Sequence, residues 1–167
     1  MPDLLVATDS EAVFQELRSV LDAPGTRIRW ARAGADVAPA LDAAPADLAI
    51  LDMQIGAMGG VAVALDLRLE ADAGRLERCP VLLVLDRRPD VFLARRIGVE
   101  GWLVKPLDPI RIRRAATALL AGGTWHDTSW MPEPATVRPH PAPAPDQPTP
   151  ASDQAVDAQV AAAAAGA

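Results

Sequence analysis

Two kinds of apolar pattern alternate along residues 1–122. Short runs of consecutive apolar residues predict five β-strands, at residues 4–8, 28–31, 48–51, 81–85 and 101–104. Apolar positions three or four residues apart predict helices between them, one after residue 10 and the others at 34–44, 60–71, 90–97 and 109–121. The run at 81–85 is apolar at every position, which is typical of a strand covered on both faces. Strictly alternating strands and helices predict an α/β fold with a doubly wound, five-stranded parallel sheet.

The composition changes at Gly122-Gly123. Eight of the 16 prolines fall between positions 132 and 150, and the sequence ends in an alanine-rich stretch. Such a segment buries too little apolar surface to offset its chain entropy, so residues 123–167 are predicted to be a disordered Pro/Ala-rich tail. Trp125, at the root of this tail, is expected to pack back onto the domain formed by residues 1–122.

Charge and composition narrow the functional classes. The net charge is −6, which argues against binding to nucleic acid, and the single cysteine, Cys79, excludes a disulfide framework or a Cys-rich zinc site. The N-terminus lacks the basic region of a signal peptide, and no apolar stretch is long enough to span a bilayer. We therefore expect a soluble, cytoplasmic protein with no membrane contact. Of the 16 basic residues, 15 are Arg, so the lone lysine, Lys105, marks a position where Arg would not serve.

Polar residues follow the predicted strands at their carboxyl ends, where ligands bind in doubly wound sheets. Asp9 follows the first strand, Asp52 the third, Asp86 the fourth and Lys105 the fifth. Carboxylates brought together suit a hard cation such as Mg²⁺, and an aspartate can attack phosphorus to form an acyl phosphate while a lysine neutralises the phosphoryl oxygens. The pattern predicts phosphoryl chemistry at this edge of the sheet.

Two segments carry a family resemblance. The segment 48–60 (LAILDMQIGAMGG) and the segment 101–107 (GWLVKPL) resemble the phosphoacceptor and lysine motifs of response-regulator receiver domains, over about residues 2–122. The resemblance implies a flavodoxin-like, receiver-type fold. It also implies that Asp52 is the phosphoacceptor and that Lys105 contacts the phosphoryl group. Mg²⁺ would be held by Asp9, Asp52 and the backbone carbonyl of Gln54.

Further positions follow from the same resemblance, and some depart from it. Pro106 matches a proline that family members hold in a cis bond, and Trp102 matches an aromatic switch position, although it is more often a core residue. Thr8 replaces one of two adjacent acids, so Mg²⁺ binding should be weakened. Leu85 replaces a Thr or Ser whose hydroxyl bonds the phosphoryl group, a bond that leucine cannot make. Asp86 is expected to lead into the next helix; turned toward the site, it would pair with Lys105 or a metal.

The resemblance implies a signalling module rather than an enzyme: an atypical, stand-alone receiver in a two-component phosphorelay. Its phosphoryl group would come from a histidine kinase or phosphotransfer protein. No output domain is recognisable after residue 122, so an unknown output protein is expected to bind the last two helices. The alternative is a pseudo-receiver, which docks a partner without phosphorylation. Leu85 and Thr8 favour the pseudo-receiver, whereas Asp52 with Lys105 favours the receiver.

Overall fold

The computed structural model describes residues 1–129, which form a parallel sheet with helices on both faces. The strands are β1 (Asp3–Ala7), β2 (Arg27–Ala31), β3 (Leu48–Asp52), β4 (Val81–Leu85), β5 (Gly101–Val104) and β6 (Trp125–His126). The α-helices are α1 (Glu11–Leu21), α2 (Val37–Ala43), α3 (Gly60–Asp72), α4 (Val91–Ile97) and α5 (Pro109–Leu120). Short 3₁₀ turns, Gly34–Asp36 and Arg88–Asp90, precede α2 and α4. The strand order is β2-β1-β3-β4-β5-β6.

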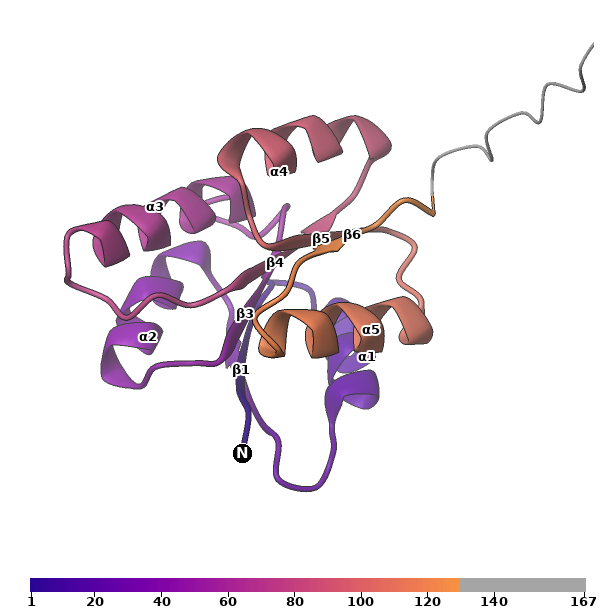
Figure 1. The fold of residues 1–167 in the computed structure, drawn as a ribbon, viewed down its shortest axis with the longest axis horizontal. Helices are drawn as coiled ribbons and strands as arrows, with labels where there is room; N and C mark the ends of the chain where they lie inside the picture. The colour runs from indigo at the N-terminus through magenta and orange to yellow at the C-terminus, as the bar shows by residue number, and fades with distance from the viewer. Residues whose placement is uncertain (130–167) are drawn as a thin grey trace, which may run out of the picture. The chain divides into compact units, whose positions relative to one another are not determined.

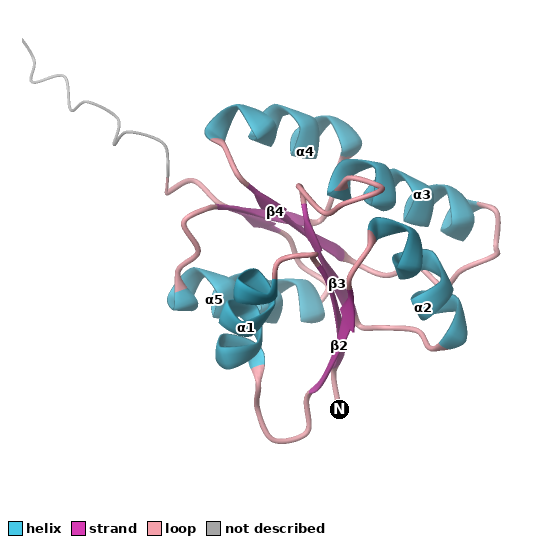
Figure 2. Ribbon diagram, turned by 180° about the vertical axis from the view of Figure 1, so that it is seen from behind, coloured by secondary structure: helices cyan, strands magenta, loops and turns pink. Residues whose placement is uncertain are grey.

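The sheet separates two apolar layers (Figures 1 and 2). Helices α1 and α5 lie on one side of it, and α2, α3 and α4 lie on the other. Successive strand residues point to opposite faces, so Leu5, Ala7 and Leu51 enter the core beneath α2, α3 and α4, whereas Val6 and Ile50 enter the core beneath α1 and α5. All five residues of β4 are buried, as predicted for a strand covered on both faces.

Polar caps fix where the helices flanking the sheet begin. The Ser10 side chain accepts a hydrogen bond from the backbone N–H of Val13, and the Asp108 side chain accepts one from the N–H of Arg111. Each cap satisfies a donor that has no partner within the first helical turn. Pro109 then occupies the first turn of α5, where its missing N–H costs nothing.

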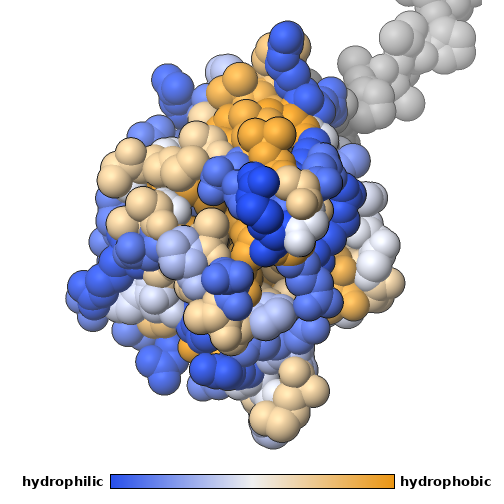
Figure 3. Space-filling model, turned by 90° about the vertical axis from the view of Figure 1, so that its left-hand side faces the viewer, coloured by the Kyte–Doolittle hydropathy of each residue, from blue (hydrophilic) through white to orange (hydrophobic). Residues whose placement is uncertain are grey.

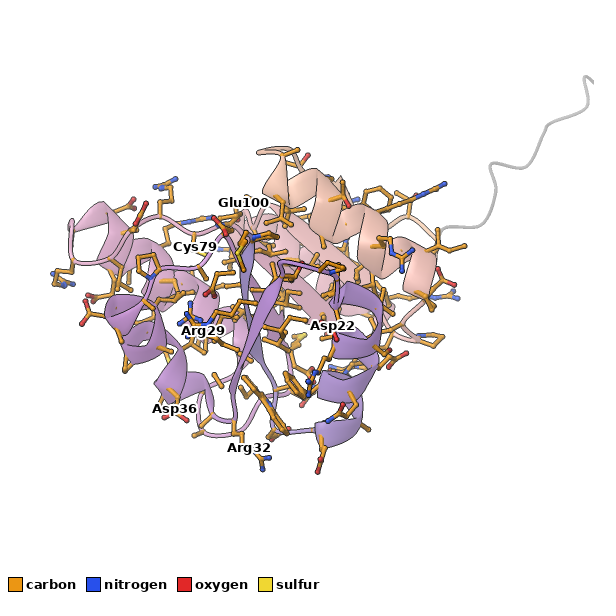
Figure 4. All side chains as sticks on the ribbon, turned by 90° about the horizontal axis from the view of Figure 1, so that it is seen from below. Asp22, Arg29, Arg32, Asp36, Cys79 and Glu100 are labelled. Carbon is orange, nitrogen blue, oxygen red and sulfur yellow. The ribbon has the colours of Figure 1, made fainter. Side chains whose placement is uncertain are left out.

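One arginine ties the outer strand to the neighbouring helix. Arg29 projects from β2 toward α2 (Figure 4), donating from Nε to Asp3 at 2.7 Å and from its terminal nitrogens to the carbonyl oxygens of Ala40 and Ala44 at 2.8 Å. The guanidinium thus gives the carbonyl groups at the end of α2 a donor, in addition to the N–H of Ala44 that already bonds Ala40, while its Nε pairs with Asp3 of β1.

The predicted fold class is confirmed, with one correction to the strand number. The described residues contain six strands rather than five, because Trp125 pairs with Gly101 and His126 pairs with Trp102. Trp125 and His126, expected in the disordered tail, therefore form a strand of the sheet. Residues 130–167 of the predicted tail lie outside the described residues. None of the helices in residues 1–129 has the length and apolar character needed to cross a bilayer.

Gly60 tests how tightly α3 packs against the end of β3. A Cβ added at Gly60 would lie 2.5 Å from the carbonyl oxygen of Asp52, whereas at Gly59 the nearest atom would be 3.4 Å away. Gly60→Ala should lower the free energy of unfolding by about 1–3 kcal/mol more than Gly59→Ala, because backbone must shift to admit the methyl group. Denaturant unfolding of the two variants measures the difference; equal stabilities would contradict the close approach.

Candidate functional site

Four strands end at one edge of the sheet and bring the predicted polar residues together. Ala7 pairs with Leu51, Asp52 with Val84, and Leu85 with Val104, so β1, β3, β4 and β5 finish side by side. The residues at these ends are Thr8, Asp9, Asp52, Asp86 and Lys105. The ends of β1 and β3 are adjacent at the point where the strand order reverses, the usual place for a ligand site in such a sheet.

Asp52 lies at the centre of this edge. Its side chain is only 4% exposed, and both carboxylate oxygens are bonded. Oδ2 accepts a hydrogen bond from the Thr8 hydroxyl at 2.8 Å, and Oδ1 accepts one from Lys105 Nζ at 3.1 Å. The backbone N–H of Gln54 adds a longer bond to Oδ1 at 3.4 Å. A buried carboxylate needs such donors in place of water, so these bonds fix the position of the Asp52 side chain at the end of the sheet.

Lys105 is shared between two carboxylates. Its Nζ lies 3.1 Å from Asp52 Oδ1 and 2.9 Å from Asp86 Oδ1. Burial alone would lower the pKa of Lys105, but the hydrogen bonds and charges of Asp86 and Asp52 outweigh it and raise the pKa above the ordinary value. Lys105 therefore remains protonated at every physiological pH, and a cation always stands beside Asp52.

The direction of the Asp86 side chain is the part of the site that the sequence predicted least well. Asp86 was expected to lead into the next helix, yet its carboxylate turns toward the site and binds Lys105. Its second oxygen, Oδ2, is buried and has no hydrogen-bond partner among residues 1–129. An anion with one unsatisfied oxygen depends strongly on its remaining partner. Asp86 thus competes with Asp52 for the site's ammonium group.

Thr8 contributes a hydrogen-bond donor at the position where the resemblance predicts an acid. Its side chain is fully buried, its hydroxyl donates to Asp52, and the same oxygen accepts from the N–H of Ser10 at 3.2 Å. The backbone oxygen of Thr8 accepts a bond from the Trp30 indole at 2.8 Å, and that indole stacks on Phe14. Thr8 is consequently a buried part of the site, and its hydroxyl and backbone oxygen are both hydrogen-bonded.

The remaining predicted metal ligands are only partly assembled around Asp52. Asp9 is exposed, and its Oδ2 accepts a bond from the N–H of Gly56 at 3.0 Å, which ties it to the β3–α3 loop. Gln54 reaches Asp52 through its N–H. No group of three or more His, Cys, Asp or Glu side chains that could hold a metal ion occurs in residues 1–129. The donors predicted for a cation are two carboxylates and a backbone carbonyl, and all three are hard oxygen ligands of the kind that Mg²⁺ takes.

The two positions of the expected switch are core residues. Leu85 is fully buried among the apolar side chains beneath α3 and α4, and Trp102 is 3% exposed. The Trp102 ring stacks on His126 of β6, with ring centroids 3.9 Å apart. The Lys105–Pro106 peptide bond is cis, as the resemblance implied. Leu85 has no polar group to offer a ligand at Asp52, and the indole Nε1 of Trp102 is buried with no hydrogen-bond partner among residues 1–129.

The shared lysine gives a direct test of this arrangement. Asp86→Asn and Asp52→Asn should each lower the pKa of Lys105, since each removes one carboxylate that favours the ammonium form. The double variant lacks both carboxylates and keeps only the effect of burial. The pKa of Lys105 in it should therefore fall below that of an exposed lysine. Because the chain has one lysine, ¹⁵N-lysine labelling gives a single side-chain signal for the NMR titration. Unchanged pKa values in both single variants would contradict the shared ion pair.

Comparison with known proteins agrees with this geometry. The family model described as the response regulator receiver domain matches residues 4–117. Protein PilH of Pseudomonas aeruginosa is 27% identical over 125 residues, covering 73% of this chain and all of PilH. The uncharacterized response regulatory protein Rv3143 of Mycobacterium tuberculosis is 38% identical over 81 residues, covering 48% of this chain and 57% of that protein.

Other relatives extend beyond the matched region. The aerobic respiration control protein ArcA of Escherichia coli is 26% identical over 120 residues, and the chain spans about half (49%) of its length and matches over 72% of its own. Among solved structures, CheY4 of Vibrio cholerae shares the fold with a TM-score of 0.62 at 21% identity, covering 71% of this chain and 98% of that one. A receiver domain of a histidine kinase from Syntrophus aciditrophicus gives 0.65 at 24% identity, covering 73% and 92%. By its fold, its polar edge and the match over residues 4–117, the chain belongs to the response regulator receiver domain family.

Proposed function

We propose that Asp52 accepts a phosphoryl group from a phosphohistidine of a histidine kinase or phosphotransfer protein. The observation that carries the proposal is the Lys105 ammonium group 3.1 Å from a buried Asp52 carboxylate at the carboxyl edge of the sheet. An Asp52 oxygen attacks phosphorus, the P–N bond of the donor breaks, and its electron pair stays on the imidazole nitrogen. An acyl phosphate remains on Asp52, and the charge of Lys105 stabilises the phosphoryl oxygens.

The donor set fits Mg²⁺, the cation that receiver domains generally bind. Asp9, Asp52 and the backbone carbonyl of Gln54 would hold it, with water completing the shell. When bound, the ion supplies positive charge that neutralises the phosphoryl oxygens. Only two of these donors are charged, because Thr8 stands where an additional acid is usual and its hydroxyl is already bonded to Asp52. Binding should therefore be weaker than in a site with three carboxylates.

Asp86 slows the phosphorylation of Asp52. An incoming phosphoryl group must weaken the ion pair between Asp86 and Lys105. The negative charge of Asp86 also repels it. Both effects slow phosphoryl uptake without preventing it. The pseudo-receiver alternative is not favoured, since Asp52, Lys105 and Asp9 all stand at the same edge of the sheet and the lysine already contacts the acceptor.

The output is proposed to be protein contact through the last two helices, as in a signalling module that is not itself an enzyme. Helix α4 exposes Phe92 (66%) and Leu93 (38%), and α5 exposes Ile110 (63%). Figure 3 shows hydrophobic surface toward the top of the view, the end at which Figure 1 places α4. Arg95 and Arg96 follow on α4, so the partner would combine apolar and acidic groups.

Intact mass measures the phosphorylation directly. The wild-type chain incubated with Mg²⁺ and acetyl phosphate, or with a phosphorylated phosphotransfer protein, should gain one phosphoryl group, and Asp52→Asn should gain none. Asp9→Asn keeps Asp52 and should gain the group more slowly, since one charged donor for the cation is lost. An adduct on Asp52→Asn, or none on the wild type with either donor, would contradict Asp52 as the acceptor.

Restoring the missing acid should strengthen the cation site. Thr8→Asp should tighten Mg²⁺ binding about tenfold, because an added carboxylate increases the charge of the ligand set. The isosteric control Thr8→Asn adds no charge and should not tighten it. A Mg²⁺ titration followed by tryptophan fluorescence suits the measurement, since the Trp30 indole is bonded to the backbone of residue 8. Equal affinities in the three proteins would place the cation away from Thr8.

A further inference from the structure

The segment after α5 turns back onto the sheet and brings the Asp127 side chain to the backbone of Val104, the residue before Lys105. The backbone N–H of Trp125 donates to the carbonyl oxygen of Glu100 at 3.0 Å. The backbone N–H of Asp127 donates to the carbonyl oxygen of Trp102 at 3.2 Å. These bonds place β6 along the outer edge of β5 (Figure 1). The family match ends at residue 117, so this segment lies beyond the part of the chain that the match covers.

Asp127 completes the edge where the backbone of β6 stops. Its side chain is buried, and Oδ2 accepts a hydrogen bond from the N–H of Val104 at 3.0 Å, so a carboxylate replaces the next sheet partner. Oδ1 accepts from the N–H of Ser129 at 2.9 Å. Burial would raise the pKa of Asp127, but these bonds, with the charge of Arg111, hold it below the ordinary value. The carboxylate is therefore charged at neutral pH.

Arg111 extends this contact along the chain on both sides of Lys105. From α5, its Nη1 donates to Asp127 Oδ2 at 2.6 Å and lies 3.4 Å from the carbonyl oxygen of Val104. Its Nη2 donates to the carbonyl oxygen of Pro106 at 2.6 Å. The Arg111 guanidinium thus contacts Val104, before Lys105, and Pro106, after it. The Asp127 carboxylate bonds Val104 a second time, through its N–H.

The inner side of Lys105 is held independently. Its N–H donates to the carbonyl oxygen of Leu85 at 2.8 Å, and its Nζ reaches Asp52 and Asp86. With β4 on one side and the Asp127–Arg111 pair on the other, the backbone that carries the lysine has little freedom. A contacting group displaced by about 1 Å can lose much of its effect on a reaction, so a fixed backbone matters for this lysine.

We propose that Asp127 and Arg111 are positioning residues that fix the backbone of Lys105 so that its ammonium group meets the phosphoryl group on Asp52. The inference rests on the proposed function. It makes the segment after α5 part of the receiver's working site, because Val104, the residue before the lysine, is held by a residue 23 positions further along the chain.

The full-length chain tests this by the rate at which Asp52 gains a phosphoryl group from acetyl phosphate. Asp127→Ala should slow uptake about tenfold through the displaced lysine, and Asp127→Asn, which keeps an oxygen acceptor for Val104, should recover part of the rate. In a Lys105→Ala background, Asp127→Ala should have no further effect, since both changes act through one group. Thr128→Ala is the neighbouring control at an exposed side chain and should leave the rate unchanged.

The outcomes separate this inference from the function on which it rests. No uptake by the wild type, either from acetyl phosphate or from a phosphorylated phosphotransfer protein, overturns the proposed function. Normal uptake by Asp127→Ala, or equal slowing with and without Lys105, overturns the positioning role alone. A readout independent of phosphorylation is the ¹⁵N-lysine titration. Asp127→Ala should lower the pKa of Lys105, because a displaced ammonium group binds Asp52 and Asp86 less well. If Asp127→Ala does not fold, Asp127→Asn carries the same measurement, and an unmoved lysine pKa in it overturns the inference.

Discussion

A single ammonium group joins three strand ends at the polar edge of this sheet. Lys105 projects from the end of β5 and pairs with Asp52 at the end of β3 and Asp86 after β4. A buried carboxylate such as Asp52 would be costly without a paired cation, and a second acid that shares the same lysine adds repulsion that the ammonium group offsets. The pairing of Asp52 inside the sheet edge and the direction of Asp86 both depend on this shared ion pair.

The departures from the family pattern have one physical theme. Where a switch hydroxyl is usual, Leu85 adds to the apolar core, and where an acid is usual, Thr8 donates to Asp52. Both changes reduce the number of polar groups that can move around Asp52 and put fixed contacts in their place. Trp102 follows the same course, since its ring is buried and stacked on His126. What can still respond to a new charge at Asp52 is the ion pair between Lys105 and Asp86, whose free oxygen has no donor among residues 1–129.

Local sequence carried most of the fold and part of the site. The ends of β3 and β5 follow from short apolar runs, so Asp52 and Lys105 could be placed at one edge from the pattern alone. The direction of Asp86 could not, because it depends on loop geometry after β4 and on a lysine 19 residues away. The fold of residues 123–129 was hidden by composition. The proline-rich residues 132–150 dominate the composition of the segment after residue 122. The structure of residues 125–127 depends instead on a few specific contacts of Trp125, His126 and Asp127.

The short sixth strand also changes what the sheet presents to other chains. An uncovered edge of a sheet offers unpaired backbone groups to which a foreign strand can add, and proteins commonly block it with a very short strand or with charge. Here β6 covers β5 with two residues, and the opposite edge, β2, carries Arg27 and Arg29. Within the described residues neither edge is a long, uncharged template, so edge-to-edge aggregation of copies is disfavoured and association is left to the helical faces.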